Sequence, residues 1–190
     1  MMRNRRSLPL LAPVSVVTLM AAAASGQSIT NIGVPAGATT SGANAVSANG
    51  SAVAASVFFE SANRWSAGVF TNLGLPPGAF AAGAEDISHD GNAIVGSVFF
   101  ITPEETARAY RWTAGGGMQE LGTLAGGIAS IGNGISGDGN VVTGASFDQD
   151  FNTTAFRWTS AGGMQSLGTL AGGTSSEGRR VSQDGSVIVG

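Results

Sequence analysis

Residues 134–170, GISGDGNVVTGASFDQDFNTTAFRWTSAGGMQSLGTL, contain in order the features that decide the fold of this chain. These features are a Ser-x-Asp-Gly segment, an apolar run, an Arg-Trp pair, and a Leu-Gly followed by further glycines. They return in the same order along most of the 190 residues. Self-similarity of this kind indicates a repeat architecture, in which each copy is one structural unit.

Each copy opens with a valine or isoleucine followed by serine. The four openers are Val46, Ile87, Ile135 and Val181, which lie 41, 48 and 46 residues apart. The length varies only between the apolar run and the tryptophan, where a surface loop tolerates insertion. The spacing predicts complete units at 45–85, 86–133 and 134–179 and partial units at 28–44 and 180–190.

Every complete unit is predicted to form four short antiparallel strands. The pair Asp138-Gly139 predicts a hairpin with a type I′ turn, because asparagine or aspartate followed by glycine tolerates the positive φ that this turn requires. The apolar run 141–144 predicts a second strand covered on both faces. Phe156 and Trp158 lie two residues apart in the third strand and therefore share one face. The fourth strand is expected at 164–167, after a glycine-rich turn.

A four-stranded meander of about 46 residues has the size of one β-propeller blade. The predicted fold is therefore all-β, with repeated four-stranded antiparallel meanders as propeller-like blades. Three units are complete, and the array is an open arc or a fragment. Residues 28–44 are expected to add a fourth strand, and residues 180–190 a first and a second strand. Further repeats or another chain are expected to cover the open apolar edge at 187–190.

The first 26 residues predict a signal peptide. Three arginines, Arg3, Arg5 and Arg6, precede an apolar stretch at 8–24, and the small residues Ala24-Ser25-Gly26 form a cleavage site. The mature chain is then exported, with no membrane span, and is extracellular, attached to the cell surface or periplasmic. Both the general secretory route and the twin-arginine route fit the arginines.

Charge and cysteine content exclude several classes of function. All nine basic residues are arginine, and six of them remain against twelve carboxylates after cleavage. A net charge of this sign excludes a nucleic-acid partner, since phosphates require clustered cations. The absence of cysteine excludes disulfides, a thiolate nucleophile and cysteine-ligated metals.

Several segments resemble the HAF family of probable extracellular repeats. They are ISGDGNVVTG, AFRWTSAGGMQSLGTLAGG, VSQDGSVIVG, ISHDGNAIVG and AYRWTAGGGMQELGTLAGG. The resemblance is strong over 86–190 and weak over 28–85, and it implies a bacterial exported or cell-surface protein. The Ser-x-Asp-Gly hairpins also resemble the blade hairpins of TolB-like propellers. They differ from the sialidase Asp-box, in which glycine comes two residues after aspartate.

The repeated polar residues are interpreted as structural. Aspartate before glycine caps its own turn, and arginine before tryptophan is expected to bind a hairpin aspartate or a backbone carbonyl. These structural repeat residues are Asp90, Gly91, Asp138, Gly139, Asp184, Gly185, Arg111, Trp112, Arg157 and Trp158. The alternatives are a ring of carboxylates for the aspartates and an anion or glycan site for the arginines.

The sequence contains three further groups of polar residues that could be functional. Asp148, Asp150 and Asn152 have a spacing that would place three oxygens on Ca²⁺, although Thr153 stands where an EF-hand requires glycine. The alternative is a solvated acidic loop with no cofactor. His89, the only histidine, is interpreted as an exposed turn residue, and the pair Glu85-Asp86 as ordinary surface charge.

These features favour a non-catalytic binding or structural module that is exported from a bacterial cell. The loops between the second and third strands, at 60–63, 102–108 and 147–154, vary most and are expected to carry recognition of an extracellular ligand, either a glycan or a protein. The alternative is an exported propeller enzyme, such as a glycan hydrolase, with carboxylates at its central channel.

Overall fold

The computed structural model describes residues 30–58, 60–101 and 107–190. The predicted signal peptide at 1–26 lies outside the described residues. The chain divides into two units, 1–31 and 32–190, and all fourteen described strands belong to the second unit. No helix in the described part of the chain is long and apolar enough to cross a membrane.

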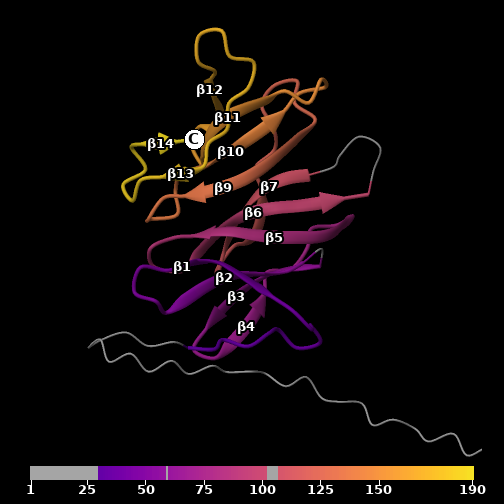
Figure 1. Cartoon of the computed structure of the whole chain (residues 1–190), viewed down its shortest axis with the longest axis vertical. Helices are drawn as coiled ribbons and strands as arrows, with labels where there is room; N and C mark the ends of the chain where they lie inside the picture. The colour runs from indigo at the N-terminus through magenta and orange to yellow at the C-terminus, as the bar shows by residue number, and fades with distance from the viewer. Residues whose placement is uncertain (1–29, 59, 102–106) are drawn as a thin grey trace, which may run out of the picture. The chain divides into compact units, whose positions relative to one another are not determined.

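Twelve of the strands form three four-stranded antiparallel sheets (Figure 1). The first sheet consists of β1 (Gly42–Val46), β2 (Ala52–Val57), β3 (Ser61–Ser66) and β4 (Val69–Asn72). The second consists of β5 (Ala79–Ile87), β6 (Ala93–Phe100), β7 (Ala107–Thr113) and β8 (Gly117–Glu120). The third consists of β9 (Ala129–Ile135), β10 (Val142–Phe147), β11 (Thr153–Thr159) and β12 (Gly163–Gly168). In each sheet the strands lie in chain order, which confirms the predicted repeated meanders.

The first strand of each sheet is longer than the sequence pattern indicated. In the three four-stranded sheets the opener is the last residue of the first strand, and that strand begins several residues earlier. In the third sheet, for example, β9 reaches back to Ala129, whereas the repeat boundary lies at 134. The sequence of β9, ASIGNGI, is mostly small and polar, so it carries little of the alternation that marks a strand.

The two partial units differ from each other. Residues 180–190 form the expected first and second strands, β13 (Arg180–Val181) and β14 (Ile188–Val189). The fourth strand expected at 28–44 is wrong for the described residues, because 30–41 contain no strand and β1 is the first strand of a sheet. A fourth strand pairs with a third strand, and among the described residues no strand precedes β1. The glycines nevertheless keep the repeat geometry: φ is +74° at Gly33 and +71° at the equivalent Gly168.

The turns between first and second strands are not of type I′. Only the glycine of each Asp-Gly pair has a positive φ, for example +72° at Gly139, while Asp138 does not. The amide of Gly139 donates to the carbonyl oxygen of Ser136 at 2.9 Å. This bond closes a four-residue turn with glycine in its last position, as in the common type I geometry.

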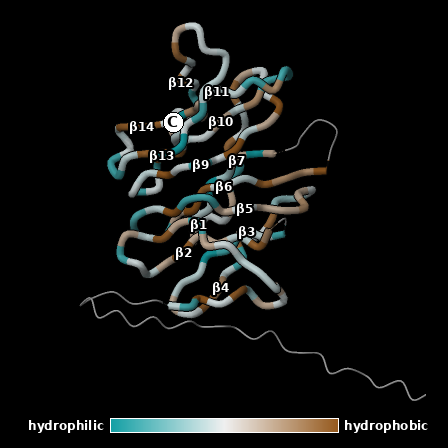
Figure 2. The backbone as a smooth tube through the Cα atoms, viewed as in Figure 1, coloured by the Kyte–Doolittle hydropathy of each residue, from teal (hydrophilic) through white to brown (hydrophobic). Residues whose placement is uncertain are grey.

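The apolar core lies between successive sheets. Trp112 and Tyr110 of the second sheet pack against Ala52, Ala54 and Leu73 of the first. Trp158 and Phe156 of the third sheet pack in the same way against the equivalent residues of the second, which are Ala93, Val95 and Leu121. Figure 2 shows hydrophobic residues along the strands of all the sheets. Each interface therefore joins an aromatic face to a face of small residues, so that neighbouring sheets cover one another.

Candidate functional site

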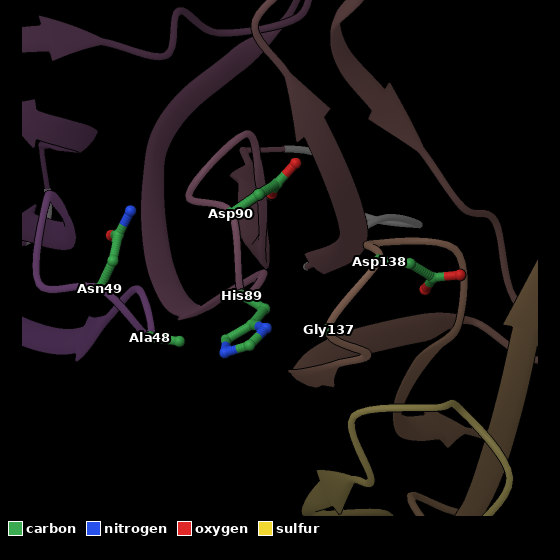
Figure 3. A pocket seen from close by; sticks show the side chains of 6 residues that line it. All are labelled: Ala48, Asn49, His89, Asp90, Gly137 and Asp138. Atoms are coloured by element: carbon green, nitrogen blue, oxygen red, sulfur yellow. The ribbon is translucent and has the colours of Figure 1, made fainter.

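The four Ser-x-x-Gly turns lie in a row, here called the turn row (residues 47–50, 88–91, 136–139 and 182–185). Figure 3 shows the first three turns, with Ala48, His89 and Gly137 at their second positions. Backbone hydrogen bonds join the second residues of successive turns. The amide of Ala48 donates to the carbonyl of His89 at 3.1 Å, and the amide of His89 donates to the carbonyl of Gly137 at 2.9 Å. The amide of Gly137 donates in turn to the carbonyl of Gln183 at 2.9 Å. The sheets are thus linked along one end by their main chains.

Side chains within each turn explain the repeated serine and aspartate. Ser136 Oγ donates to Asp138 Oδ1 at 2.6 Å and accepts from the amide of Val141 at 2.9 Å. Asp138 Oδ1 also accepts from the amide of Asn140 at 3.0 Å. The hydrogen bond from Ser136 lowers the pKa of Asp138. Each aspartate is therefore occupied by its own turn, which is the geometry expected of an aspartate cap.

The same bonds occur in the other three turns, with one natural variation. Asn49 takes the place of aspartate in the first sheet and accepts from Ser47 Oγ at 3.0 Å. In the last turn, the bond from Ser182 and bonds from Ser186 hold the pKa of Asp184 at about 2. In Figure 3 the carboxylates of Asp90 and Asp138 point away from the His89 ring. Two shallow open hollows, about 470 and 730 Å³ in volume, lie along the row.

His89 lies on the turn row, and its ring hydrogen-bonds a side chain two turns further along the row. Its Nδ1 is 2.8 Å from Nε2 of Gln183, across the intervening Gly137. Glycine is required between them, because a Cβ at position 137 would lie 2.6 Å from Cγ of Gln183. Among the described residues no carboxylate hydrogen-bonds His89. The arrangement provides neither the base and orienting group of a nucleophilic enzyme nor two opposed carboxylates.

The candidate calcium ligands lie in the loop between β10 and β11. Within this loop, the carboxylate of Asp148 accepts hydrogen bonds from the other two residues. Asp148 Oδ1 accepts from the amides of Asp150 and Asn152, both at 2.9 Å. Asp148 Oδ2 accepts from the side-chain amide of Asn152 at 3.1 Å, and this bond lowers the pKa of Asp148. In the described part of the chain, no group of three or more His, Cys, Asp or Glu side chains could hold a metal ion.

The arginines before tryptophan connect successive sheets. Arg64 Nε donates to the carbonyl of Gly91 at 2.7 Å, and Arg111 Nε donates to the carbonyl of Gly139 at 2.5 Å. Both acceptors are turn glycines of the following sheet. Arg157 makes no corresponding bond within the described residues. Arg64 and Arg111 therefore bind backbone carbonyls rather than the hairpin aspartates.

The loops between second and third strands carry exposed apolar side chains. The second strands run away from the turn row, so the described residues at their far ends lie opposite that row. Phe58, Ile101 and Phe151 are 76%, 80% and 70% exposed. Phe151 also has a φ of +61°, in a region that bulky residues rarely adopt. Strain of this kind at an exposed aromatic residue is typical of functional loops.

The interpretation of Glu85-Asp86 as ordinary surface charge fits Glu85, which is exposed, but is wrong for Asp86. Asp86 is partly buried, and its Oδ2 accepts from the amide of Ile135 in the next sheet at 3.2 Å. Burial raises the pKa of both carboxyls, and the positive charge of Arg180 opposes this rise. A departure from the repeat marks the position, because the equivalent residues in the other sheets are Ala45 and Gly134.

Comparisons with known proteins identify the fold. No protein-family model and no curated protein matches the sequence, so the resemblance to HAF repeats stays a prediction. Among solved structures, TolB from Acinetobacter baumannii is similar with a TM-score of 0.55 at 15% identity, covering 78% of this chain and 37% of TolB. A putative TolB from Agrobacterium tumefaciens has a TM-score of 0.58 at 18% identity, covering 78% of this chain and 52% of that one. The chain thus spans about a third to a half of these β-propeller proteins and shares their fold.

Proposed function

We propose that this protein is an exported, non-catalytic binding module of the bacterial cell envelope, and that it recognises another protein. The predicted signal peptide supports export, and the TolB-like architecture supports a role in the cell envelope. The surface that would bind the partner protein is formed by the loops between second and third strands. These loops differ in length and sequence while the sheets that carry them repeat, as in other rigid scaffolds with recognition loops.

The exposed apolar side chains at these loops carry the proposal. Ile101 and Phe151 are each at least 70% exposed. Large apolar and aromatic side chains at an exposed surface are typical of protein-binding sites, where they become the buried centre of an interface. The strained φ of Phe151 supports this role, since an asparagine or glycine would adopt that backbone at lower cost.

The test compares three forms of the mature protein as baits on cell-envelope extract, with chemical cross-linking. The loop variant carries Ile101→Ser and Phe151→Asn, the second of which suits the positive φ. The control variant carries Val69→Ser and Leu170→Ser, which remove two other exposed apolar side chains, 62% and 88% exposed. We expect one protein to be captured by the wild type and the control and lost from the loop variant.

Loss of capture in both variants, or in neither, would contradict recognition by these loops. The same purified protein is assayed on a panel of glycan substrates. Turnover that survives purification and disappears on Asp138→Asn would establish instead the hydrolase alternative, with a turn-row carboxylate as a catalytic residue.

A further inference from the structure

A cavity of about 350 Å³ lies between the first and second sheets, apart from the turn row. Its walls combine apolar side chains, among them Val57, Phe58 and Phe99, with the polar residues Asn44, Ser56 and Glu85. This volume is within the range of small-molecule sites, which are mostly apolar with a few convergent polar groups.

Glu85 interrupts a repeated contact at this cavity. The equivalent residues in the first and third sheets are asparagines, and each donates to a backbone carbonyl of the following sheet. Asn44 Nδ2 donates to the carbonyl of Ala84 at 2.6 Å, and Asn133 Nδ2 donates to that of Gly178 at 2.9 Å. An ionised carboxylate has no proton to donate, so Glu85 makes no such bond to the third sheet.

Glycines at an equivalent position keep the cavity open. Gly83 and its counterpart in the first sheet, Gly42, both line the cavity, whereas the equivalent residue in the third sheet is Ile131. A Cβ placed on Gly83 would lie 3.7 Å from Oε1 of Glu85 and 3.9 Å from Oγ of Ser56, both ordinary contact distances. The main chain at Gly83 therefore tolerates a side chain, and the space is left by the choice of residue rather than by strain.

The unused polar groups of the lining are all hydrogen-bond acceptors. Asn44 Nδ2 donates to Ser56 as well as to Ala84, and Ser56 Oγ binds both the amide and the carbonyl of Ala84. No described residue donates to the Glu85 carboxylate or to Oδ1 of Asn44. Arg180, the cation whose charge acts on Glu85, donates instead to the carbonyl of Asn133. A lining of this kind is complementary to a ligand that has hydrogen-bond donors and a positive charge.

We propose that this cavity binds a small organic cation, a protonated amine with an apolar or aromatic body. The ammonium group would donate to Glu85 and Asn44, and the aromatic faces of Phe58 and Phe99 would cover the body and stabilise the charge. The site shares Phe58 with the first of the proposed recognition loops, but Ile101 and Phe151, the residues changed to test protein binding, do not line it. Either proposal can therefore fail without the other.

The experiment titrates the mature protein with 2-phenylethylammonium and with its neutral analogue 2-phenylethanol, by calorimetry and by protein-observed NMR. Glu85→Asn restores the residue of the other two copies, so it removes the charge while it offers the missing bond to the third sheet. Gly83→Ile restores the residue of the third sheet and fills the cavity. Glu120→Gln, on the exposed end of β8, is the charge-matched control.

We expect saturable binding of the cation by the wild type and by Glu120→Gln, with a dissociation constant of about 1 mM or lower. Glu85→Asn should weaken binding at least about tenfold, with a melting temperature at or above that of the wild type. Gly83→Ile should abolish binding. Equal affinity for the alcohol, unchanged affinity in Glu85→Asn or Gly83→Ile, or no saturation by about 10 mM would overturn the proposal.

Discussion

Arg111 in the second sheet donates through Nε to the carbonyl oxygen of Gly139 in the third sheet, at 2.5 Å. Arg64 makes the equivalent bond from the first sheet to Gly91 in the second. The Arg-Trp pair thus does two things in one strand: the tryptophan packs against the preceding sheet, and the arginine binds the turn of the following one. The repeat of this pair along the sequence reflects the repeat of the interface.

Arg111→Lys should lower the free energy of unfolding by about 1.5–3 kcal/mol, the usual contribution of a hydrogen bond to a charged group. The flexible ammonium does not reproduce the planar guanidinium donor. Arg157→Lys is the matched control, because Arg157 makes no corresponding bond in the described chain and should change stability little. The repeat of the Arg-Trp pair by itself would predict an equal loss of stability for Arg157→Lys. Urea unfolding that shows equal effects of the two variants would contradict the structural role of the bond.

Ser136→Ala should destabilise the protein more than Ser182→Ala. Ser136 is fully buried, and its hydroxyl binds the amide of Val141, so its removal leaves a buried donor without an acceptor. The expected cost is about 1–3 kcal/mol. Ser182 makes the same bonds in an exposed hairpin, where water replaces them. Thermal unfolding of the two variants checks the order, and a larger loss for Ser182→Ala would be inconsistent with it.

The turn aspartates should make the protein acid-sensitive. Hydrogen bonds in the folded state lower the pKa of Asp90, Asp138 and Asp184 below the ordinary value of 3.8. A lowered folded-state pKa gives stability that is present above pH 4 and is lost as the pH falls through the folded pKa. Glu85 and Asp86 have the opposite effect on stability as the pH falls. Burial raises their pKa values, so protonation removes the cost of keeping a charge away from water.

Asp138→Asn isolates the turn from these opposing groups. Asn49 already fills the equivalent position in the first sheet, so the variant should fold. Melting temperature measured from pH 7 down to pH 2 should fall less steeply in Asp138→Asn than in the wild type. Parallel curves would show that the Ser136–Asp138 bond does not favour the ionised carboxylate.

Gly144→Ala should be strongly destabilising. A Cβ at Gly144 would lie only 1.9 Å from the carbonyl oxygen of Ile131 in the neighbouring strand, and Gly96 has the same relationship to Gly83. The strands must separate to accept a methyl group there, at a cost of about 3 kcal/mol. Gly115→Ala, which has nothing within 4 Å of the added Cβ, is the control and should be nearly neutral. Similar losses in both variants would argue against the close approach.

The sequence was sufficient for the features that depend on one repeat unit. The positions of the turns, the two aromatic residues of the third strand and the order of the meander follow from local patterns such as Ser136-x-Asp138 and Phe156-x-Trp158. The turn type does not, because only the glycine of each pair has a positive φ. The long first strands were missed because residues such as those at 129–133 are small, so their burial comes from close strand approach rather than from hydrophobic side chains.

The candidate sites depend on contacts between sheets, which no local pattern contains. The cavity at Glu85 exists because Gly83 lies beside Asn44 and Ser56, residues distant in the chain. The departure of Glu85 from the repeat is visible in the sequence, but only the structure shows that Glu85 and Gly83 line the same cavity. The sequence likewise leaves two acceptors for Arg64 and Arg111, a hairpin aspartate or a backbone carbonyl. The structure shows that both bind carbonyls in the turn of the next sheet.

The interlocking of successive sheets is tested most directly by three tryptophan variants in urea unfolding. Trp112 and Trp158 are 8% and 5% exposed in equivalent surroundings, whereas Trp65 is only partly buried on the first sheet. Trp112→Ala and Trp158→Ala should each lower the free energy of unfolding by about 3–5 kcal/mol, and Trp65→Ala should lower it clearly less. A Trp158→Ala variant that unfolds like the wild type, or a Trp65→Ala variant that loses as much as the other two, would contradict an array of sheets that bury one another.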